Sequence, residues 1–412
     1  MNNSEFKRQF PGDRRKFLRG AASLGAGAML GSSALRAMAA NTYMLPIGNG
    51  ERPVVQYPQK RPLIVLTSRP PQLETPFEMF NEGVVTPNDA FFVRYHLAGV
   101  PTSIDLDTFR INIKGKVDTP ISLSVDELKR FEWTEYYAVN QCSGNSRGLF
   151  EPRVAGGQLA NGAMGNAKWR GVPLKAILEK AGVQAGARQV TFNGVDGPVL
   201  PQTPDFVKAL DLDHAMDGEV MIAYQMNDSD LPMLNGYPVR LIVPGYYGTY
   251  WVKHLNEITV IDDVFNNFWM GTAYRIPDNA CACVPPGTGA NKTTPINRFD
   301  VRSFITSVMD GGKVPAGKSI TVRGIAFDGG FGIRDVALST DGGRTWKEAS
   351  LGKDLGKYSF REWQTTVTLA AGTHALKVRA VNAIGQSQPS EPLWNPSGYM
   401  RNVVETTHVH AA

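Results

Sequence analysis

The stretch Tyr136–Arg147 reads Tyr-Tyr-Ala-Val-Asn-Gln-Cys-Ser-Gly-Asn-Ser-Arg and carries a cysteine, Cys142, that stands far from any other in the chain. The apolar residues Tyr136–Val139 predict a strand, and Ser-Gly-Asn after the cysteine predicts a turn that leaves the sulfur accessible. Arg147 can return to the same pocket, where a cation favours the thiolate form of a cysteine. From these residues alone, a nucleophile, a soft metal ligand and a buried structural thiol all stay open.

A second segment, Phe91–His96, reads Phe-Phe-Val-Arg-Tyr-His. It predicts an apolar strand over Phe91–Tyr95, with Arg94 and His96 two residues apart and therefore on one face. A charge on an apolar strand needs an anionic partner unless it is solvated. The segment therefore indicates an anion site.

A third segment, Pro232–Lys253, combines a short apolar strand, a glycine-rich loop and the two cations Arg240 and Lys253. Glycines let backbone N–H groups approach a ligand closely, while arginine and lysine supply positive charge. This combination is typical of a cradle for a phosphate or a pterin. Solvated cations beside a loop are the simpler alternative.

The first forty residues have the character of an export leader. Asp13–Arg19 is a twin-arginine pattern, a weakly apolar run follows from Gly20 to about Leu35, and Ala37-Met38-Ala39 is an A-x-A cleavage site. The run is too short and too rich in small residues to predict a stable membrane span. We therefore expect a twin-arginine signal over 1–39 and a periplasmic location.

The charge of the chain changes when this leader is set aside. The full sequence has 43 basic and 38 acidic residues, a net charge of +5, but seven basic and two acidic residues lie before the cleavage site. The remaining chain carries equal numbers of each. Its composition gives no reason to expect nucleic-acid binding, and a local basic cluster is better interpreted as an anion site.

The other two cysteines, Cys281 and Cys283, are separated by one residue. A disulfide across that spacing is expected to be strained, so we predict two partly buried thiols. The sequence contains no C-x-x-C-H, which excludes covalently attached c-type haem, and no cysteine or histidine spacing typical of zinc.

The middle of the chain predicts an α+β domain. Residues 42–85, rich in proline, suggest an extended arm laid over the surface. One helix is predicted over Leu174–Ala181 with Gly182 as its C-cap, and Ser124 with Glu127 forms a capping box that opens another. Strands are predicted at Phe109–Lys114, Val190–Asn193, Val220–Gln225, Val239–Val243 and Ile258–Ile261.

After Pro295 the pattern changes to short, regularly spaced strands, which predict an all-β, immunoglobulin-like sandwich. Thr340–Trp346 is a hairpin signal between two of them. The domains are therefore expected at 40–290 and 291–412, with the boundary in the stretch 285–295. The predicted strands are Ser319–Ala326, Ile333–Ser339, Trp346–Ala349, Trp363–Leu369 and His374–Asn382.

Three motifs carry a resemblance to a known family. The segments Q-C-S-G-N-x-R, F-F-V-R-x-H and N-G-x-P-x-R-x-x-x-P-G-x-x-G-x-x-x-V-K resemble those of the sulfite oxidase family, in the same order and at similar spacing. The likeness covers nearly the whole chain after the leader and is greatest to bacterial periplasmic sulfite dehydrogenases. It implies a mixed α/β molybdopterin domain followed by a dimerisation domain.

The resemblance also implies a role for each matching residue. Cys142 would be the thiolate ligand of molybdenum beside the pterin dithiolene, and Asn235 stands where animal members have a histidine. The substrate side would be formed by Arg94, Arg147, Tyr274 and, more loosely aligned, Arg361 from the second domain. The molybdopterin would be contacted by Phe92, Arg94, His96, Asp196, Asn235, Arg240, Trp251 and Lys253.

The implied reaction is the two-electron oxidation of sulfite to sulfate. Because the sequence has no haem attachment motif, the electrons are expected to pass to a separate c-type cytochrome, and the chain to form a homodimer or a heterodimer with that cytochrome. The alternatives within the family are a sulfane dehydrogenase and a sulfoxide reductase. A cofactor-free binding protein on the same scaffold is the alternative from another class.

Overall fold

The computed structural model describes residues 42–45 and 50–412, and Met44–Ala412 forms one compact unit. The leader predicted over 1–39 lies outside the described residues, so the export signal stays a prediction. None of the helices in the described part of the chain combines the length and the apolar character that a membrane crossing requires.

The segment predicted as an extended arm instead forms a sheet. After β1 (Thr42–Leu45), strands β2 (Gly50–Val55), β3 (Leu63–Ser68), β4 (Pro71–Glu74) and β5 (Val93–Arg94) pair antiparallel in that order. The sheet buries Leu63 and Leu73. An irregularity between Val65 and Thr67 breaks the two-residue alternation that would have revealed these strands. The strand predicted over Phe91–Tyr95 is reduced to β5.

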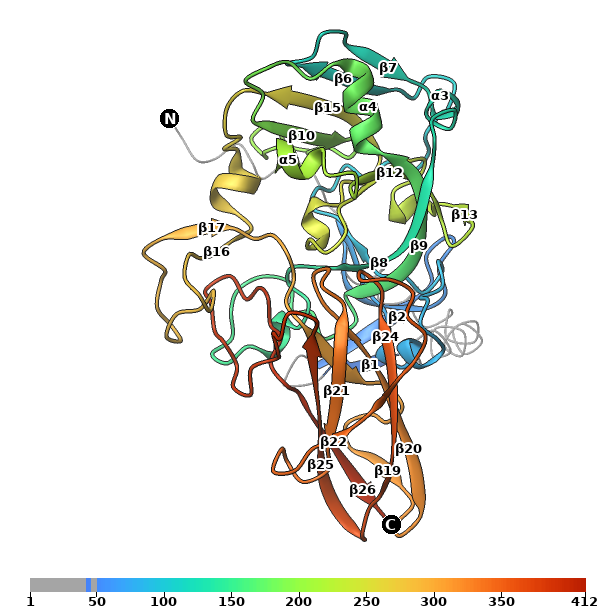
Figure 1. The fold of residues 1–412 in the computed structure, drawn as a ribbon, viewed down its shortest axis with the longest axis vertical. Coiled ribbons are helices and arrows are strands. Elements are labelled where there is room, and N and C mark those ends of the chain that lie inside the picture. Colours follow the sequence, from blue (N-terminus) through green and yellow to red (C-terminus); the bar gives the residue numbers. More distant parts are fainter. Residues whose placement is uncertain (1–41, 46–49) are drawn as a thin grey trace, which may run out of the picture. The chain divides into compact units, whose positions relative to one another are not determined.

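The second sheet contains three of the strands that the sequence predicts (Figure 1). Its order is β11 (Lys208–Asp211), β10 (Gln189–Gly194), β15 (Leu255–Ile261), β6 (Ile111–Gly115) and β7 (Ile121–Leu123). Helix α4 (Leu174–Ala181) has the predicted bounds and ends at Gly182, whose φ of 72° suits glycine. The capping box of Ser124 and Glu127 opens α3 (Val125–Leu128) as predicted, and α5 (Leu212–Ala215) is a further short helix.

The third sheet leads to Cys142. Its order is β13 (Ser229–Asp230), β12 (Met221–Met226), β9 (Met164–Pro173) and β8 (Thr134–Gln141), and β14 (Arg240–Ile242) also pairs with β12. Strand β9 is not predicted from the sequence, because its glycines, Asn166 and Pro173 are unfavourable in a strand. The β8–β9 ladder continues to Gln141 and Met164, so the strand ends directly before the cysteine.

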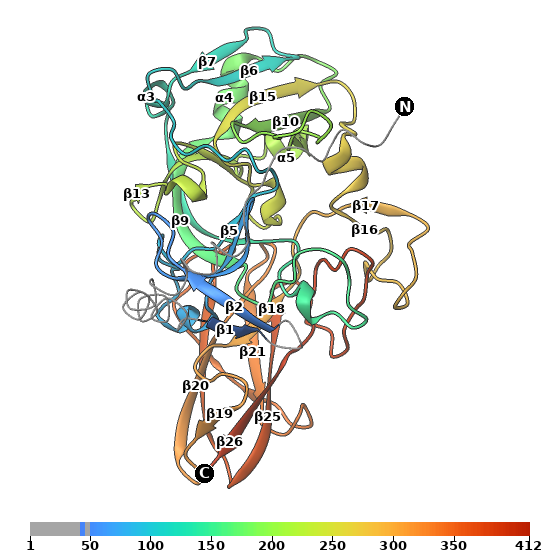
Figure 2. The ribbon, with the colours of Figure 1, turned by 180° about the vertical axis from the view of Figure 1, so that it is seen from behind.

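The remainder of the chain is all β after the single π-helical turn η5 (Phe268–Thr272) and the ribbon β16 (Arg275–Pro277) and β17 (Thr293–Pro295). Two sheets share one core that includes Val336, Trp363 and Val378. Figure 2 shows their strands from behind. The first sheet is β18 (Arg302–Ile305), β20 (Ser319–Phe327), β24 (Arg361–Thr368) and β23 (Ser350–Leu351); the second is β19 (Gly312–Val314), β26 (Thr406–Ala411), β25 (Gly372–Asn382), β21 (Ile333–Ser339) and β22 (Lys347–Glu348).

The predicted strands of this region are present, and β21 and β22 form the predicted hairpin. An immunoglobulin-like arrangement in particular stays a prediction, as do the domain boundaries. The largest apolar core joins the mixed region to the sandwich, because Trp169 and Cys142 belong to the same cluster as Phe304, Phe327 and Phe360.

The prediction for the cysteine pair was wrong: Cys281 and Cys283 form a disulfide with an S–S distance of 2.02 Å, and Cys281 is exposed. The reason lies in the residue between them. Ala282 adopts a φ of 48°, a left-handed conformation that the spacing alone does not reveal. The disulfide loop is joined to the C-terminal segment, since the backbone N–H of Val284 donates to the carbonyl of Trp394 at 2.9 Å.

Candidate active site

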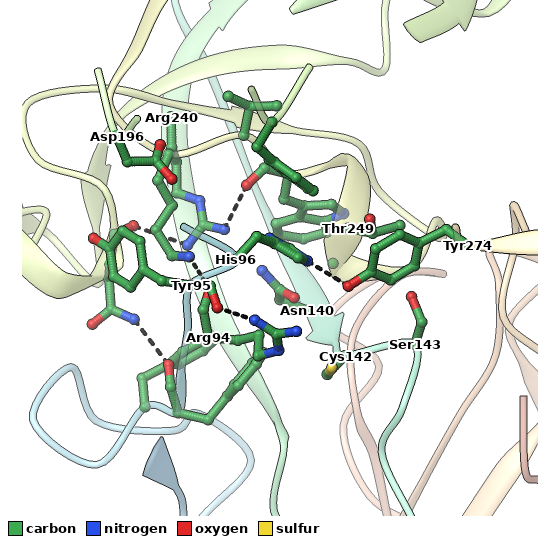
Figure 3. Close-up of a pocket in the computed structure, with 18 residues that line it drawn as sticks. Arg94, Tyr95, His96, Asn140, Cys142, Ser143, Asp196, Arg240, Thr249 and Tyr274 are labelled. Carbon is green, nitrogen blue, oxygen red and sulfur yellow. Dashed lines mark hydrogen bonds between the residues drawn. The ribbon is translucent and has the colours of Figure 1, made fainter. Parts of the chain in front are cut away.

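The structure brings most of the predicted site residues together around one pocket (Figure 3). Its walls come from β5 and the residues after it, from the end of β8, and from the loops on either side of β14. Two predicted residues, Arg147 and Arg361, do not line it. The predicted residues in its walls are Phe92, Arg94, His96, Cys142, Asp196, Asn235, Arg240, Trp251, Lys253 and Tyr274.

Cys142 sits in the turn that the sequence predicts. Its backbone N–H donates to the carbonyl of Ala163 at 2.9 Å, and its own carbonyl accepts from the N–H of Asn145 at 3.0 Å. The residue is only 8% exposed, and it lines the pocket. Both backbone groups are therefore satisfied locally, which fixes the position of the cysteine without using its sulfur.

The buried carboxylate of Glu74 supports the backbone next to this turn. Glu74 accepts hydrogen bonds from the backbone N–H groups of Ala160 at 3.0 Å and Gly162 at 2.7 Å. The same loop accepts the N–H of Ser146 through the carbonyl of Ala160 at 2.6 Å. Glu74 thus organises the backbone that holds the Cys142 turn. No local sequence signal reveals Glu74, because its role depends on a contact 86 residues away.

We expect Glu74→Gln to destabilise the protein by about 1–3 kcal/mol at low pH, because the amide N–H₂ would face a backbone donor. Burial raises the pKa of Glu74 to about 7. A carboxyl whose folded pKa is raised binds its proton more readily in the folded state. The wild-type free energy of unfolding therefore loses roughly 3 kcal/mol from this group as pH rises from about 4.5 to about 7.

Because glutamine does not titrate, the penalty of the variant should shrink over this pH window. Urea unfolding of both proteins at the two ends of the window measures the difference, and the other titrating groups cancel in the comparison. A penalty that is independent of pH would contradict this assignment.

The far side of the pocket from Tyr274 carries buried positive charge (Figure 3). Arg240 is 2% exposed and donates to the carbonyls of Asn235 at 2.9 Å and Trp251 at 3.1 Å. Burial lowers the pKa of Arg240 to about 9; burial and the charge of Arg240 lower the pKa of Lys253 to about 7. Asp196 is the acidic residue of this wall, and burial raises its pKa to about 6. With two basic residues and one acidic residue, this wall favours the binding of an anionic ligand.

Asn235 lines the pocket, but its side chain is occupied by the protein. Its Oδ1 accepts from the ammonium of Lys60, and its Nδ2 donates to the carbonyl of Phe92 at 3.1 Å. Lys60 is 2% exposed and also donates to the carbonyl of Phe91 at 3.0 Å. Asn235 therefore positions the strand before Arg94. Lys60, which the sequence analysis missed, anchors it from the N-terminal sheet.

At the Tyr274 side, aromatic rings enclose the pocket. The imidazole Nε2 of His96 is hydrogen-bonded to the hydroxyl of Tyr274, and the His96 ring stacks on Phe206 with centroids 3.7 Å apart. Burial and the charge of Arg94 lower the pKa of His96 well below its ordinary value, so the imidazole is neutral. Tyr274 has a φ of 58°, an unfavourable conformation for a non-glycine residue, of the kind that concentrates at functional sites.

Arg147 begins η2 (Arg147–Leu149) and does not line the pocket; it contacts the ring of Tyr399, which stacks on Tyr274 of the pocket wall. Its Nε donates to the carbonyl of Ser397 at 3.1 Å, and its guanidinium carbon lies 4.9 Å from the centroid of the Tyr399 ring. Tyr399 stacks on Tyr274 with centroids 5.4 Å apart and an interplanar angle of 8°. Tyr399 is thus a site residue that the sequence analysis missed, since only the folded C-terminal segment reveals its neighbours.

Three glycines from separate parts of the chain form a slot for Arg147. A Cβ at Gly144 would lie 2.9 Å from its Cζ, and a Cβ at Gly156 would lie 2.7 Å from its Nη1. At Gly398 a Cβ would lie 2.9 Å from its Cγ. These separations are too short for a real Cβ, so a side chain at any of the three positions would displace Arg147 from the slot.

The role expected for Arg361 stays a prediction. Arg361 begins β24, and its Nη1 lies 3.3 Å from Oδ2 of Asp354. It does not line the pocket. Its backbone pairs with Ala326 of β20, and its Nε and Nη1 are buried without a hydrogen-bond partner among the described residues. The C-terminal segment instead contributes Ser397 and Tyr399 near Arg147.

The pocket also contains polar atoms that lack partners. Four of its lining residues have a buried side-chain atom without a hydrogen bond, and such atoms are rare unless a ligand satisfies them. Among the described residues, no three His, Cys, Asp or Glu side chains cluster around a possible metal ion. The unpaired atoms therefore indicate that the pocket holds a bound group. The unpaired atoms are Asn140 Oδ1, Ser143 Oγ, Arg240 Nε and Thr249 Oγ1.

Comparison with known proteins identifies the bound group. Residues 96–269 match the family model described as oxidoreductase molybdopterin binding domain, and residues 293–412 match the Mo-co oxidoreductase dimerisation domain. The chain is 33% identical over 378 residues to mitochondrial sulfite oxidase of Macaca fascicularis, covering 87% of this chain and 68% of that protein. The chain belongs to the sulfite oxidase family. Sulfite oxidase of Gallus gallus is 32% identical over 370 residues, covering 85% and 79%.

The fold agrees with this family assignment. The crystal structure of the sulfane dehydrogenase SoxCD from Paracoccus pantotrophus superposes with a TM-score of 0.70 and 24% identity, covering 87% of each chain. The cofactor of this chain is accordingly a molybdenum-bearing molybdopterin, and the enzyme acts as an oxidoreductase of sulfur compounds.

The residues of the pocket fit such a cofactor. An anionic phosphate on the pterin would offset the charges of Arg240 and Lys253, and the pterin would offer partners to the unpaired atoms of Asn140, Ser143 and Thr249. Cys142 would supply the protein's thiolate to the metal.

Proposed function

We propose that this protein oxidises sulfite to sulfate in the periplasm and passes the electrons to a separate c-type cytochrome. The observation that carries the proposal is the position of Cys142 in a pocket rich in buried cations, within a chain whose relatives include sulfite oxidases. When bound, the molybdenum cofactor supplies the two-electron redox chemistry and the oxygen transfer.

The residues of this chain bind and orient the reactants. Arg94 and the nearby Arg147 attract the oxyanion, and a planar guanidinium can bind two of its oxygens. The bond from His96 to the Tyr274 hydroxyl holds the phenol at the pocket wall. Because His96 is neutral, its Nε2 makes the hydrogen bond to the Tyr274 hydroxyl without adding charge to the site. The surrounding aromatic rings limit the access of water.

The location, the acceptor and the assembly form part of the same proposal. The twin-arginine pattern supports export, and the absence of a haem motif in the sequence supports a separate cytochrome. The match to a dimerisation domain supports a dimer, with a second copy or with the cytochrome subunit. Cell fractionation and the mass of the purified assembly test these points.

The deciding experiment is a sulfite oxidation assay on the purified full chain with its molybdenum content measured. We expect sulfite-dependent reduction of ferricyanide and of a c-type cytochrome, in proportion to bound molybdenum. Protein with full molybdenum content and no sulfite-dependent reduction of either acceptor would overturn the proposal.

A second candidate is oxidation of a sulfur atom carried on another protein, as a sulfane dehydrogenase would do. It is favoured by one observation: Arg361, the third arginine expected to bind a small dianion, is held by Asp354 outside the pocket. Activity that appears only with a sulfur-loaded carrier protein, and not with free sulfite, would select this candidate.

A further inference from the structure

Lys208, the first residue of β11, is a buried cation that the proposed chemistry leaves unexplained. Lys208 is 0% exposed. Burial lowers the pKa of its ammonium to about 7. Burying an ammonium is unfavourable by several kcal/mol unless it is compensated. The burial of Lys208 therefore needs an explanation other than simple stability.

The surroundings of Lys208 hold its charge without neutralising it. Its Nζ donates to the carbonyl of Trp269 at 2.7 Å and lies 4.7 Å from the ring centroid of Tyr250 and 5.1 Å from that of Tyr274. A carbonyl oxygen and two aromatic faces attract a cation but carry no net charge. The positive charge of Lys208 therefore remains available to the neighbouring site.

The positive charge of Lys208 acts on His96, a residue of the pocket. Together with burial and with Arg94 and Lys253, Lys208 lowers the pKa of His96, which lines the pocket beside Tyr274. Arg240 and Asp196 lie at the other side of the pocket in the view of Figure 3. Lys208 thus adds a positive electrostatic field at the Tyr274 end of the pocket, where the substrate is expected to bind. The ring of Tyr274 lies between its ammonium and the pocket.

We propose that Lys208 is a positioning residue that sets the charge preference of the site: its field selects a doubly charged oxyanion over a singly charged one of the same shape. The inference rests on the proposed function, since it assumes that the oxidised substrate binds beside Tyr274.

The test measures binding of two tetrahedral oxyanions by isothermal titration calorimetry at a pH below 7: sulfate, a dianion, and perchlorate, a monoanion. Coulomb energy is proportional to ligand charge, so Lys208→Met should weaken perchlorate about threefold and sulfate by the square of that factor, about tenfold. The KM for sulfite should rise by between about threefold and tenfold, because sulfite below pH 7 is a mixture of the dianion and the monoanion hydrogen sulfite, while kcat changes by less than about twofold.

Two variants separate charge from structure. Lys208→Gln keeps an N–H donor for the carbonyl of Trp269 but has no charge, so it should bind sulfate as weakly as Lys208→Met. Lys180→Met removes another lysine that lies over an aromatic ring, 5.0 Å from the centroid of Phe131 and outside the pocket, and should leave binding unchanged. Recovery of sulfate affinity in Lys208→Gln, or equal weakening of both anions, overturns the inference.

The outcomes also distinguish this inference from the proposed function. If Lys208→Met weakens sulfate binding as expected but the wild type does not oxidise sulfite, the proposed function is refuted and the charge preference is confirmed. If the wild type oxidises sulfite and Lys208→Met changes neither the KM for sulfite nor the affinity for sulfate, the proposed function stands and the charge preference is refuted.

Discussion

Replacing Cys142 by alanine is expected to leave the protein folded and to reduce sulfite oxidation at least about a thousandfold, a loss of roughly 4 kcal/mol in transition-state stabilisation. The fold should survive because the backbone bonds of the turn, to Ala163 and from Asn145, do not involve the sulfur. Activity should be lost because the variant removes the thiolate that would bind the metal. Steady-state kinetics with ferricyanide, normalised to protein folded by circular dichroism, measure the effect.

The matched control removes the other cysteines. Cys281→Ser combined with Cys283→Ser eliminates a disulfide outside the pocket, and sulfite oxidation by this double variant should match the wild type. Sulfite oxidation at the wild-type rate by Cys142→Ala would refute the ligand assignment. Pterin content is a separate readout: Arg240 and Lys253 are unchanged in the variant, so the cofactor should still co-purify.

Gly398→Ala is expected to lower kcat/KM for sulfite by about a hundredfold, although Gly398 does not line the pocket. An added Cβ would strike Cγ2 of Val154 and lie 2.9 Å from Cγ of Arg147, at a φ of 61° that already disfavours alanine. The clash should displace Arg147 from its slot and from its position over Tyr399. We also expect a loss of about 1–3 kcal/mol in stability from overpacking, measured by urea unfolding.

A second glycine separates backbone strain from displacement of the arginine. Gly385 has a φ of 86° with open space around it, so Gly385→Ala should lose about 1 kcal/mol of stability and no activity. A double-mutant cycle then completes the test. In an Arg147→Met background, Gly398→Ala should have little further effect on kcat/KM, because both changes remove the same interaction. Full additivity would show that Gly398 acts by another route.

The parts of the site that sequence motifs could predict are those in which chemistry is local. Cys142 with its turn, Arg94 with His96, and Arg240 with Lys253 each lie within one short segment, and the structure places all of them in one pocket. Glu74, Lys60, Tyr399 and Lys208 could not be found in this way, because each acts through contacts with residues distant in sequence.

The fold shows the same division between local and long-range information. Helix α4 and strand β21 have their predicted bounds because periodicity and capping define them within a few residues. Strand β9 was missed because its glycines and Pro173 are tolerated only through pairing with β8 and β12 on either side. The disulfide of Cys281 and Cys283 was missed because it depends on the backbone conformation of a single alanine.

The buried cations have a consequence for how the protein matures. Lys60 reaches Asn235 across 175 residues, and Arg147 reaches Ser397 across 250, so the pocket closes only after distant segments have met, which is slow. During closure, Arg240 and Lys253 repel one another and lose hydration. An anionic cofactor acts as their counter-ion, and its binding free energy adds to that of folding. A chain with this charge arrangement gains most stability from receiving its cofactor while it folds.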